Sequence, residues 1–232
     1  MRKYFVEALL IFLSILGSFF IESYRIKQVS IDNKNNLLAE LIEIINEDLK
    51  QIEKIISIQN ESIDACNRLI KNNSSKQNMS KEDISENHLK AGRAVTSFYC
   101  QKGIYSQLLS SGSLELISFR SLRLKLIYVY DHLNERKLGI DRVVDDSGSR
   151  ASEMLNKNII VLTEKDQINK NYIYSDRKIT SSIIKDSYYN SPEVLGYYSN
   201  LLNTSRSYVD LLKLFKIEFE EIINLIDQEI NL

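Results

Sequence analysis

The feature that most constrains this chain is an apolar segment near its beginning, residues 4–21, in which Glu7 is the only charged residue. Arg2 and Lys3 precede it, and no proline separates it from the amphipathic stretch that follows. Its strictly uncharged part, residues 8–21, corresponds to about 21 Å of helix, which is shorter than the ~30 Å hydrocarbon core of a bilayer. Length therefore leaves a membrane span, a signal-peptide core and a buried helix as alternatives.

Two tyrosines at the ends of this segment favour the membrane span. Tyr4 and Tyr24 are 20 residues apart, a distance of about 30 Å in a helix, and aromatic rings are enriched at the two membrane interfaces. Glu7 then lies one turn inside the first interface, where a carboxylate costs less than at the bilayer centre. We expect the chain to contact the lipid bilayer through Tyr4 to Tyr24.

The residues after the apolar segment argue against a cleaved signal peptide. A cleavage site needs small residues, whereas residues 19–24 read Phe-Phe-Ile-Glu-Ser-Tyr. We therefore expect an uncleaved signal anchor with a single span. Arg2, Lys3 and the α-amine on one side nearly balance Arg25, Lys27 and Lys34 on the other. The short N-terminal tail favours a cytoplasmic N-terminus with the remainder of the chain outside.

Composition predicts long helices and a balanced surface charge. The chain has 232 residues, with 30 basic and 31 acidic side chains and a net charge of −1, so we expect no nucleic-acid partner. One proline and seven glycines favour uninterrupted helices. The prediction is a membrane anchor at residues 1–24 followed by one α-helical bundle domain at residues 25–232.

Heptad spacing supports a bundle after the anchor. With Leu38 at position a, position e is wholly apolar, and polar residues interrupt positions a and d. The positions are Leu38, Ile45, Ile52, Gln59 and Cys66 at a; Leu41, Asp48, Ile55, Ser62 and Leu69 at d; and Ile42, Leu49, Ile56, Ile63 and Ile70 at e. A stripe this wide favours packing against two or more helices over a two-stranded coiled coil.

Polar and turn-forming residues divide the remainder of the chain. Residues 72–87 are rich in Asn, Ser and Lys and predict an exposed polar loop. Residues 110–113 read Ser-Ser-Gly-Ser and predict a helix end, with Gly112 in the left-handed conformation. A further long helix is expected to begin near Ser118 or Ser121.

The region from residue 139 to residue 191 is less regular in its pattern. Residues 145–149 predict a turn, and Ile159 to Leu162 fits a helix or a strand; we favour broken helices here. Ser191 as N-cap and Pro192 at the first helical position then mark a final helix that runs to the C-terminus. The expected fold is all-α: an N-terminal transmembrane helix that continues into an antiparallel multi-helix bundle.

Two residue types are candidates for sites. Cys66 and Cys100 lie on successive predicted helices and form a disulfide in an oxidising compartment or, alternatively, are two small buried residues. Close tyrosine pairs predict either an interaction surface or helix interfaces that place hydroxyls at the rim. The pairs nominated for the surface are Tyr172 and Tyr174, Tyr188 and Tyr189, and Tyr197 and Tyr198.

Motifs for catalysis or metal binding are not found. His132 and Glu135 have a helical i,i+3 spacing, but a di-metal bundle needs two motifs in the opposite order. His88 is expected at the solvated edge of the polar loop. The sequence holds no Walker A loop, dinucleotide-binding glycine pattern, nucleophile elbow, HExxH or CxxC. We therefore assign no catalytic, cofactor or metal residue.

Three stretches carry a resemblance to a known family. They are residues 5–11 leading to Gly17, residues 37–41 followed by Glu47-Asp48-Leu49, and residues 105–117. Their order resembles an uncharacterised bacterial family, a domain of unknown function, of single-span membrane proteins with a helical extramembrane body. The resemblance implies a topology and no activity. It places the chain in the bacterial inner (cytoplasmic) membrane as a single-pass protein, with the body periplasmic or otherwise extracytoplasmic.

These patterns favour a membrane-anchored helical interaction or scaffold protein without catalytic activity. Its partner is an unidentified protein or, as a homo-oligomer, another copy of itself. An extracytoplasmic sensory or ligand-binding bundle is the main alternative, and it predicts a cavity lined by tyrosines. A membrane-associated enzyme, with a site assembled only in three dimensions, and a pore-forming role are further alternatives.

Overall fold

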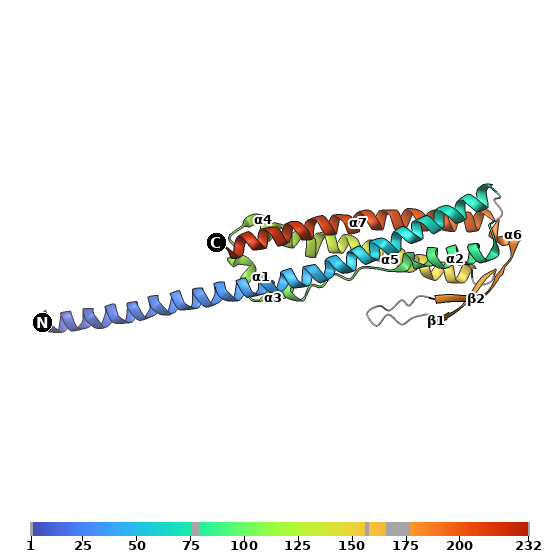
Figure 1. Cartoon of the computed structure of the whole chain (residues 1–232). Helices are drawn as coiled ribbons and strands as arrows, with labels where there is room; N and C mark the ends of the chain where they lie inside the picture. Colours follow the sequence, from blue (N-terminus) through green and yellow to red (C-terminus); the bar gives the residue numbers. More distant parts are fainter. Residues whose placement is uncertain (1, 76–78, 156–157, 166–176, 232) are drawn as a thin grey trace. The chain divides into compact units, whose positions relative to one another are not determined.

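The computed structural model describes residues 2–75, 79–155, 158–165 and 177–231 (Figure 1). It confirms the mostly all-α fold and adds a small two-stranded antiparallel sheet. The elements in order are α1 (Arg2–Ser75), α2 (Lys81–Gly92), η1 (Arg93–Val95), α3 (Gly103–Ser110), η2 (Ser113–Leu116), α4 (Arg120–Ile127), the π-helical turn η3 (Tyr128–Leu133), α5 (Asn134–Leu155), β1 (Ile159–Lys165), β2 (Arg177–Ile184), α6 (Asp186–Tyr189) and α7 (Pro192–Ile230).

The chain divides into two compact units, and α1 and α7 contribute residues to both. The first unit comprises Met1–Glu47, Gln101–Tyr130 and Phe219–Leu232, and the second comprises Asp48–Cys100 and Asp131–Glu218.

In the first unit, α1 lies beside α3 and the end of α7 (Figure 1), and its first buried side chain is that of Lys34. The Tyr105 and Tyr130 rings stack at 4.7 Å, and Tyr130 also lies 6.1 Å from Phe219. These contacts tie α3, the π-helical turn and α7 together. Between α3 and η2, Gly112 has φ 71°, which confirms the predicted left-handed turn.

The heptad prediction for α1 holds in detail. Every a and d residue from Leu38 to Leu69 is buried, and every e residue in that stretch is partly buried. The polar residues at a and d have partners: Gln59 donates hydrogen bonds to the carbonyls of Ala94 and Thr96, and Ser62 donates to that of Ala91. Gln59 and Ser62 therefore hold the end of α2 and the backbone that follows it in the second unit.

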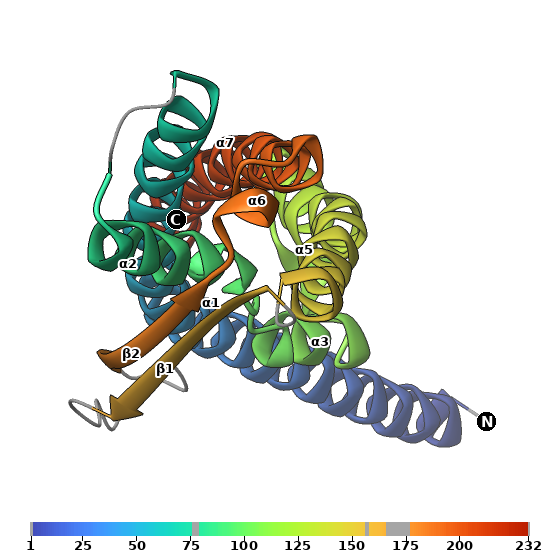
Figure 2. The same ribbon diagram turned by 90° about the vertical axis from the view of Figure 1, so that its right-hand side faces the viewer.

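The sheet in the second unit corrects the expectation of broken helices at residues 159–162. β1 and β2 lie side by side (Figure 2), with Ile159 paired to Ile184 and an irregularity between Leu162 and Thr163. Ile159 and Ile184 are buried. Consecutive β-branched residues fit a pleated strand with one buried face, and this preference decides the structure of the short apolar run.

The predicted exposed loop at residues 72–87 is wrong over most of its length. α1 continues to Ser75 and α2 begins at Lys81, and Asn72, Ile84, Ser85 and Asn87 are buried. Polar side chains make the connection by bonding to backbone. The side-chain Oδ1 of Asn72 accepts a hydrogen bond from the Met79 N–H, and the Ser80 hydroxyl accepts one from the Asp83 N–H as an N-cap.

The predicted irregular region 139–191 is likewise more regular than expected. α5 runs to Leu155 and includes residues 145–149, for which we predicted a turn. Single Asp, Ser or Gly residues reduce helix propensity by about 1 kcal/mol or less each, which is too little to end a long helix. The start of α7 is as predicted, since the Ser191 hydroxyl accepts a 3.4 Å hydrogen bond from the Val194 N–H.

Candidate functional site

The N-terminal part of α1 carries a long, fully exposed apolar surface. The large hydrophobic side chains from Leu9 to Tyr24 are 45–82% exposed, and Phe20 is the most exposed of them at 82%. None of the most apolar 18-residue window is buried inside the structure. Each such side chain left in water forgoes about 1.5–3 kcal/mol. This helix is long and apolar enough to cross a membrane.

Tyr4 and Tyr24 remain at the two ends of this surface, 75% and 66% exposed. Ser14 and Ser18 within it donate their hydroxyl hydrogens to the carbonyls of Leu10 and Ser14, both at 2.9 Å. These hydroxyls therefore carry no unpaired donor into an apolar medium.

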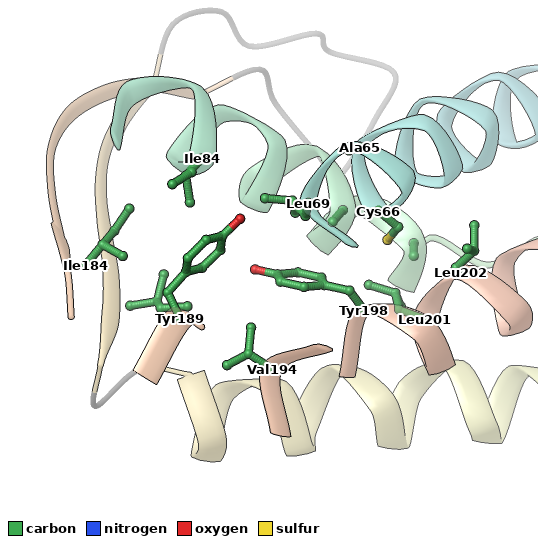
Figure 3. Close-up of a cluster of buried hydrophobic side chains, with 13 residues drawn as sticks. Ala65, Cys66, Leu69, Ile84, Ile184, Tyr189, Val194, Tyr198, Leu201 and Leu202 are labelled. Atoms are coloured by element: carbon green, nitrogen blue, oxygen red, sulfur yellow. The ribbon is translucent and has the colours of Figure 1, made fainter. Parts of the chain in front are cut away.

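In the second unit, titratable side chains gather in the apolar cluster drawn in Figure 3. Nδ1 of His88 on α2 lies 2.8 Å from the Tyr198 hydroxyl on α7, and the two rings meet edge to face at 6.2 Å. Tyr189 of α6 accepts a 3.0 Å hydrogen bond from the Asn72 amide. Tyr189, Tyr198 and Cys66 are all buried in this cluster.

Burial holds this cluster in its neutral form. It lowers the pKa of His88 to about 4 and raises the pKa of Cys66 to about 12, against the opposing effect of the Ser62 hydrogen bond. The pKa of Tyr197 rises to about 12 and that of Tyr198 lies well above its usual value, again mainly through burial. Near pH 7 the cluster therefore contains no thiolate or imidazolium, and His88 is a weak base.

A second polar group surrounds Lys137 of α5, whose side chain is 2% exposed. Its ammonium donates to the Phe98 carbonyl at 2.6 Å and pairs with Asp141. It also lies 5.6 Å and 5.9 Å from the centroids of the Phe98 and Tyr99 rings. The Phe98 N–H donates to the Tyr208 hydroxyl at 2.6 Å. Both backbone groups of Phe98 are thus held, so this arrangement fixes a non-helical segment.

A third polar group joins α1, α4 and α7 in the first unit. The Glu229 carboxylate pairs with Lys34 and accepts 2.9 Å hydrogen bonds from the Ser118 and Phe119 N–H groups at the start of α4. Burial raises the pKa of Glu229, but the bonds from Lys34, Ser118 and Phe119 outweigh it, so the pKa lies below its usual value. The role of this group is to cap a helix and neutralise a buried charge.

The residues nominated from the sequence have mixed outcomes. The prediction that Tyr189 and Tyr198 belong to an interaction surface is wrong. Both are core residues, because their rings fill helix interfaces. Tyr188 and Tyr197 pack partly buried against the same cluster, and Tyr172 and Tyr174 lie outside the described residues. Cys66 and Cys100 are not joined to each other, so the possible disulfide is absent from this structure.

The histidines and the serine turn carry no assembled site. His88 is not solvated as expected, since it bonds to Tyr198, whereas His132 and Glu135 are both exposed. The Ser111 and Ser113 hydroxyls bond to each other across the Gly112 turn at 2.8 Å. Within the described ranges, no group of three His, Cys, Asp or Glu residues is placed to hold a metal ion.

Sequence reasoning missed Lys34, Lys137 and Glu229. A signal was present, because each continues an apolar helical repeat: Lys34 precedes Leu38 and Leu41, Lys137 follows Leu133, and Glu229 follows Ile222 and Ile226. A charge on the apolar seam of a helix predicts a buried pair or a capped helix end.

Comparison of the chain with protein-family models, with curated proteins and with solved structures gave no match.

Proposed function

We propose that this protein is a membrane-anchored helical interaction or scaffold protein without catalytic activity. The observation that carries the proposal is the exposure of α1: the apolar surface from Leu9 to Ile21 is uncovered, and the same helix becomes a buried wall from Leu37 onward. One continuous helix thus serves as the tether and as the first element of the folded body.

The interior chemistry supports a role without catalysis. The Lys137 group and the Glu229 group each satisfy backbone and neutralise a buried charge, and the His88 and Tyr198 side chains bond to each other. None combines an accessible nucleophile with a base whose pKa is near neutral, which covalent catalysis would require.

The proposal includes a topology: a single pass in the bacterial cytoplasmic membrane with the body extracytoplasmic. Cysteine labelling in intact cells tests this topology. The variant used combines Cys66→Ala and Cys100→Ala with Lys50→Cys, which lies at an exposed position of α1. A membrane-impermeant maleimide labels this thiol if the body lies outside. Labelling only after cell lysis would reverse the orientation and leave the anchor in place.

Membrane fractionation tests the anchor. The full chain should stay in the membrane pellet after an alkaline carbonate wash and be released by detergent. Leu13→Arg combined with Leu16→Arg places two charges near the middle of the apolar segment, where each costs about 2.5–3.5 kcal/mol, and should move the protein to the soluble fraction.

A matched control keeps the added charge outside the segment. Gln28→Arg lies on the exposed part of α1 after Tyr24 and should leave the protein in the pellet. Recovery of the unaltered chain in the soluble fraction would overturn the proposal, and a mass that begins beyond Tyr24 would show a cleaved signal peptide instead.

A further inference from the structure

The apolar surface of α1 does not stop at the end of the proposed span. Ile26 and Val29 follow Arg25 and are 56% and 62% exposed, in a stretch where Asp32 and Asn33 are exposed as well. The body begins only at Lys34. Two β-branched apolar side chains therefore lie on a solvent-exposed helix that nothing else in the first unit covers (Figure 1).

Helical spacing places these side chains on a defined face. At about 100° per residue, Val29 lies within roughly 60° of Ile11, Ser14, Ser18, Glu22, Arg25 and Ile26. We refer to these seven residues as the pairing face. Lys27 and Ile31 lie on the opposite side of the helix, on the line that continues into the buried residues Lys34 and Leu38. The pairing face is thus directed away from the core seam.

The pairing face is shaped for close approach of another helix. Ser14 and Ser18 are one turn apart, and a shallow groove lined by Ser14, Ile15, Ser18, Phe19 and Glu22 runs along it. Small residues at this spacing let two helix backbones come near each other in a membrane. Because both serine hydroxyls already bond to backbone carbonyls, contact with an apolar neighbour leaves no donor unpaired.

Charge on the same face is self-complementary. Glu22 and Arg25 form an exposed i,i+3 ion pair, with nitrogen to oxygen distances of 2.8 Å and 3.1 Å. In two parallel helices related by a two-fold axis, Glu22 of each copy faces Arg25 of the other, so the same residues can pair between copies. A partner that carried only one sign of charge would leave either Glu22 or Arg25 opposed by a like charge.

We propose that a second copy of this chain occupies the pairing face, with the two α1 helices parallel from Ile11 to Val29. The inference rests on the proposed function, because insertion of both copies in one membrane with the same topology makes their helices parallel. It brings Ile26 and Val29 of one copy against those of the other at equal height above the bilayer, which covers the apolar side chains that are otherwise in water.

Cysteine crosslinking in native membranes tests the pairing. In a background with Cys66→Ala and Cys100→Ala, one variant carries Val29→Cys on the pairing face, and its control carries Lys27→Cys. The two positions are two residues apart and about 160° apart around the helix. A mild oxidant should give at least five-fold more disulfide-linked dimer with Val29→Cys than with Lys27→Cys.

The outcomes separate this inference from the proposed function. Equal crosslinking at both positions indicates random collision, and absence of dimer indicates separate chains; either result overturns the pairing while the protein stays in the carbonate-washed pellet. Loss of both variants from that pellet would instead overturn the anchor on which the pairing depends.

Two further substitutions test the packing and the charge. Ser18→Leu in the Val29→Cys chain fills the groove and should reduce the dimer several-fold without releasing the chain from the membrane. Glu22→Arg should reduce the dimer as well, because it opposes like charges, and adding Arg25→Glu should restore it. Failure of the double reversal to restore the dimer would rule out the ion pair between copies.

Discussion

The buried ammonium of Lys34 pairs with the carboxylate of Glu229, which is 195 residues further along the chain. The side chains are 5% and 0% exposed. The same carboxylate accepts hydrogen bonds from Ser118 and Phe119 at the start of α4. One charged group therefore connects three distant parts of the first unit at the point where α1 joins the body.

Removing this charge should destabilise the first unit strongly. Glu229→Gln keeps the size of the side chain but leaves Lys34 buried without a counter-charge, and breaking such a pair typically costs about 3–5 kcal/mol. Urea unfolding of the detergent-solubilised full chain, followed by circular dichroism, measures the loss. Because the pKa of Glu229 in the folded protein lies below its unfolded value, its stabilisation is present above pH 4.5 and is lost as pH falls further.

Glu86→Gln is the matched control, since Glu86 pairs with Lys90 on the exposed surface of α2. Its effect should be below about 1 kcal/mol. Equal effects of Glu86→Gln and Glu229→Gln would show that the buried pair contributes no more than a surface pair.

His88 should make the second unit less stable in mild acid. Its pKa is about 4 when folded and 6.5 in the unfolded reference, so between these values the unfolded chain binds more protons. Stability therefore falls as pH drops from about 6.5 to 4, by up to about 3 kcal/mol. Urea midpoints measured at pH 7.5, 5.5 and 4.5 should decline in this window. The window lies mostly above the pH range in which the stabilisation by Glu229 is lost.

His88→Gln separates this effect from other titrating groups. The amide can keep a hydrogen bond to the Tyr198 hydroxyl but does not gain a proton, so the variant should lose most of the decline between pH 6.5 and 4.5. An unchanged decline in His88→Gln would place the titration at another residue.

The fold could be predicted wherever apolar periodicity is strong. The a and d residues of α1, the left-handed Gly112 and the Ser191 cap of α7 each follow from local side-chain and backbone preferences. The connection after Asn72 could not, because it depends on side-chain bonds to backbone a few residues away. β1 depends on pairing with β2, which begins 12 residues after β1 ends.

The polar interior was harder to predict than the helices. His88 meets Tyr198 across 110 residues, and Lys137 meets Phe98 across 39. Sequence spacing within one helix says nothing of such partners, so His88 was expected in solvent and Tyr198 on a surface. The apolar neighbours of Lys34 and Glu229 predict burial of these charges, but the identity of the partner requires the fold.

The two cysteines should differ sharply in reactivity. Cys66 is fully buried with a pKa of about 12, whereas Cys100 is partly exposed. A maleimide at pH 7.5 should modify the native solubilised protein once, and Cys100→Ala should remain unmodified until it is denatured. Intact mass spectrometry counts the adducts. Absence of labelling in both the native and the denatured unreduced protein would indicate a disulfide instead.

Two glycines should respond to alanine with opposite signs. A Cβ added at Gly112 or Gly139 meets no atom within 4 Å, so neither substitution creates a clash. Gly112 has φ 71°, where a Cβ is strained, and Gly112→Ala should destabilise the protein by about 1 kcal/mol. Gly139 lies inside α5, where alanine is the better helix former, and Gly139→Ala should stabilise by up to about 1 kcal/mol. Urea midpoints of the two variants measure both effects; a shift in the same direction would show that backbone conformation does not decide them.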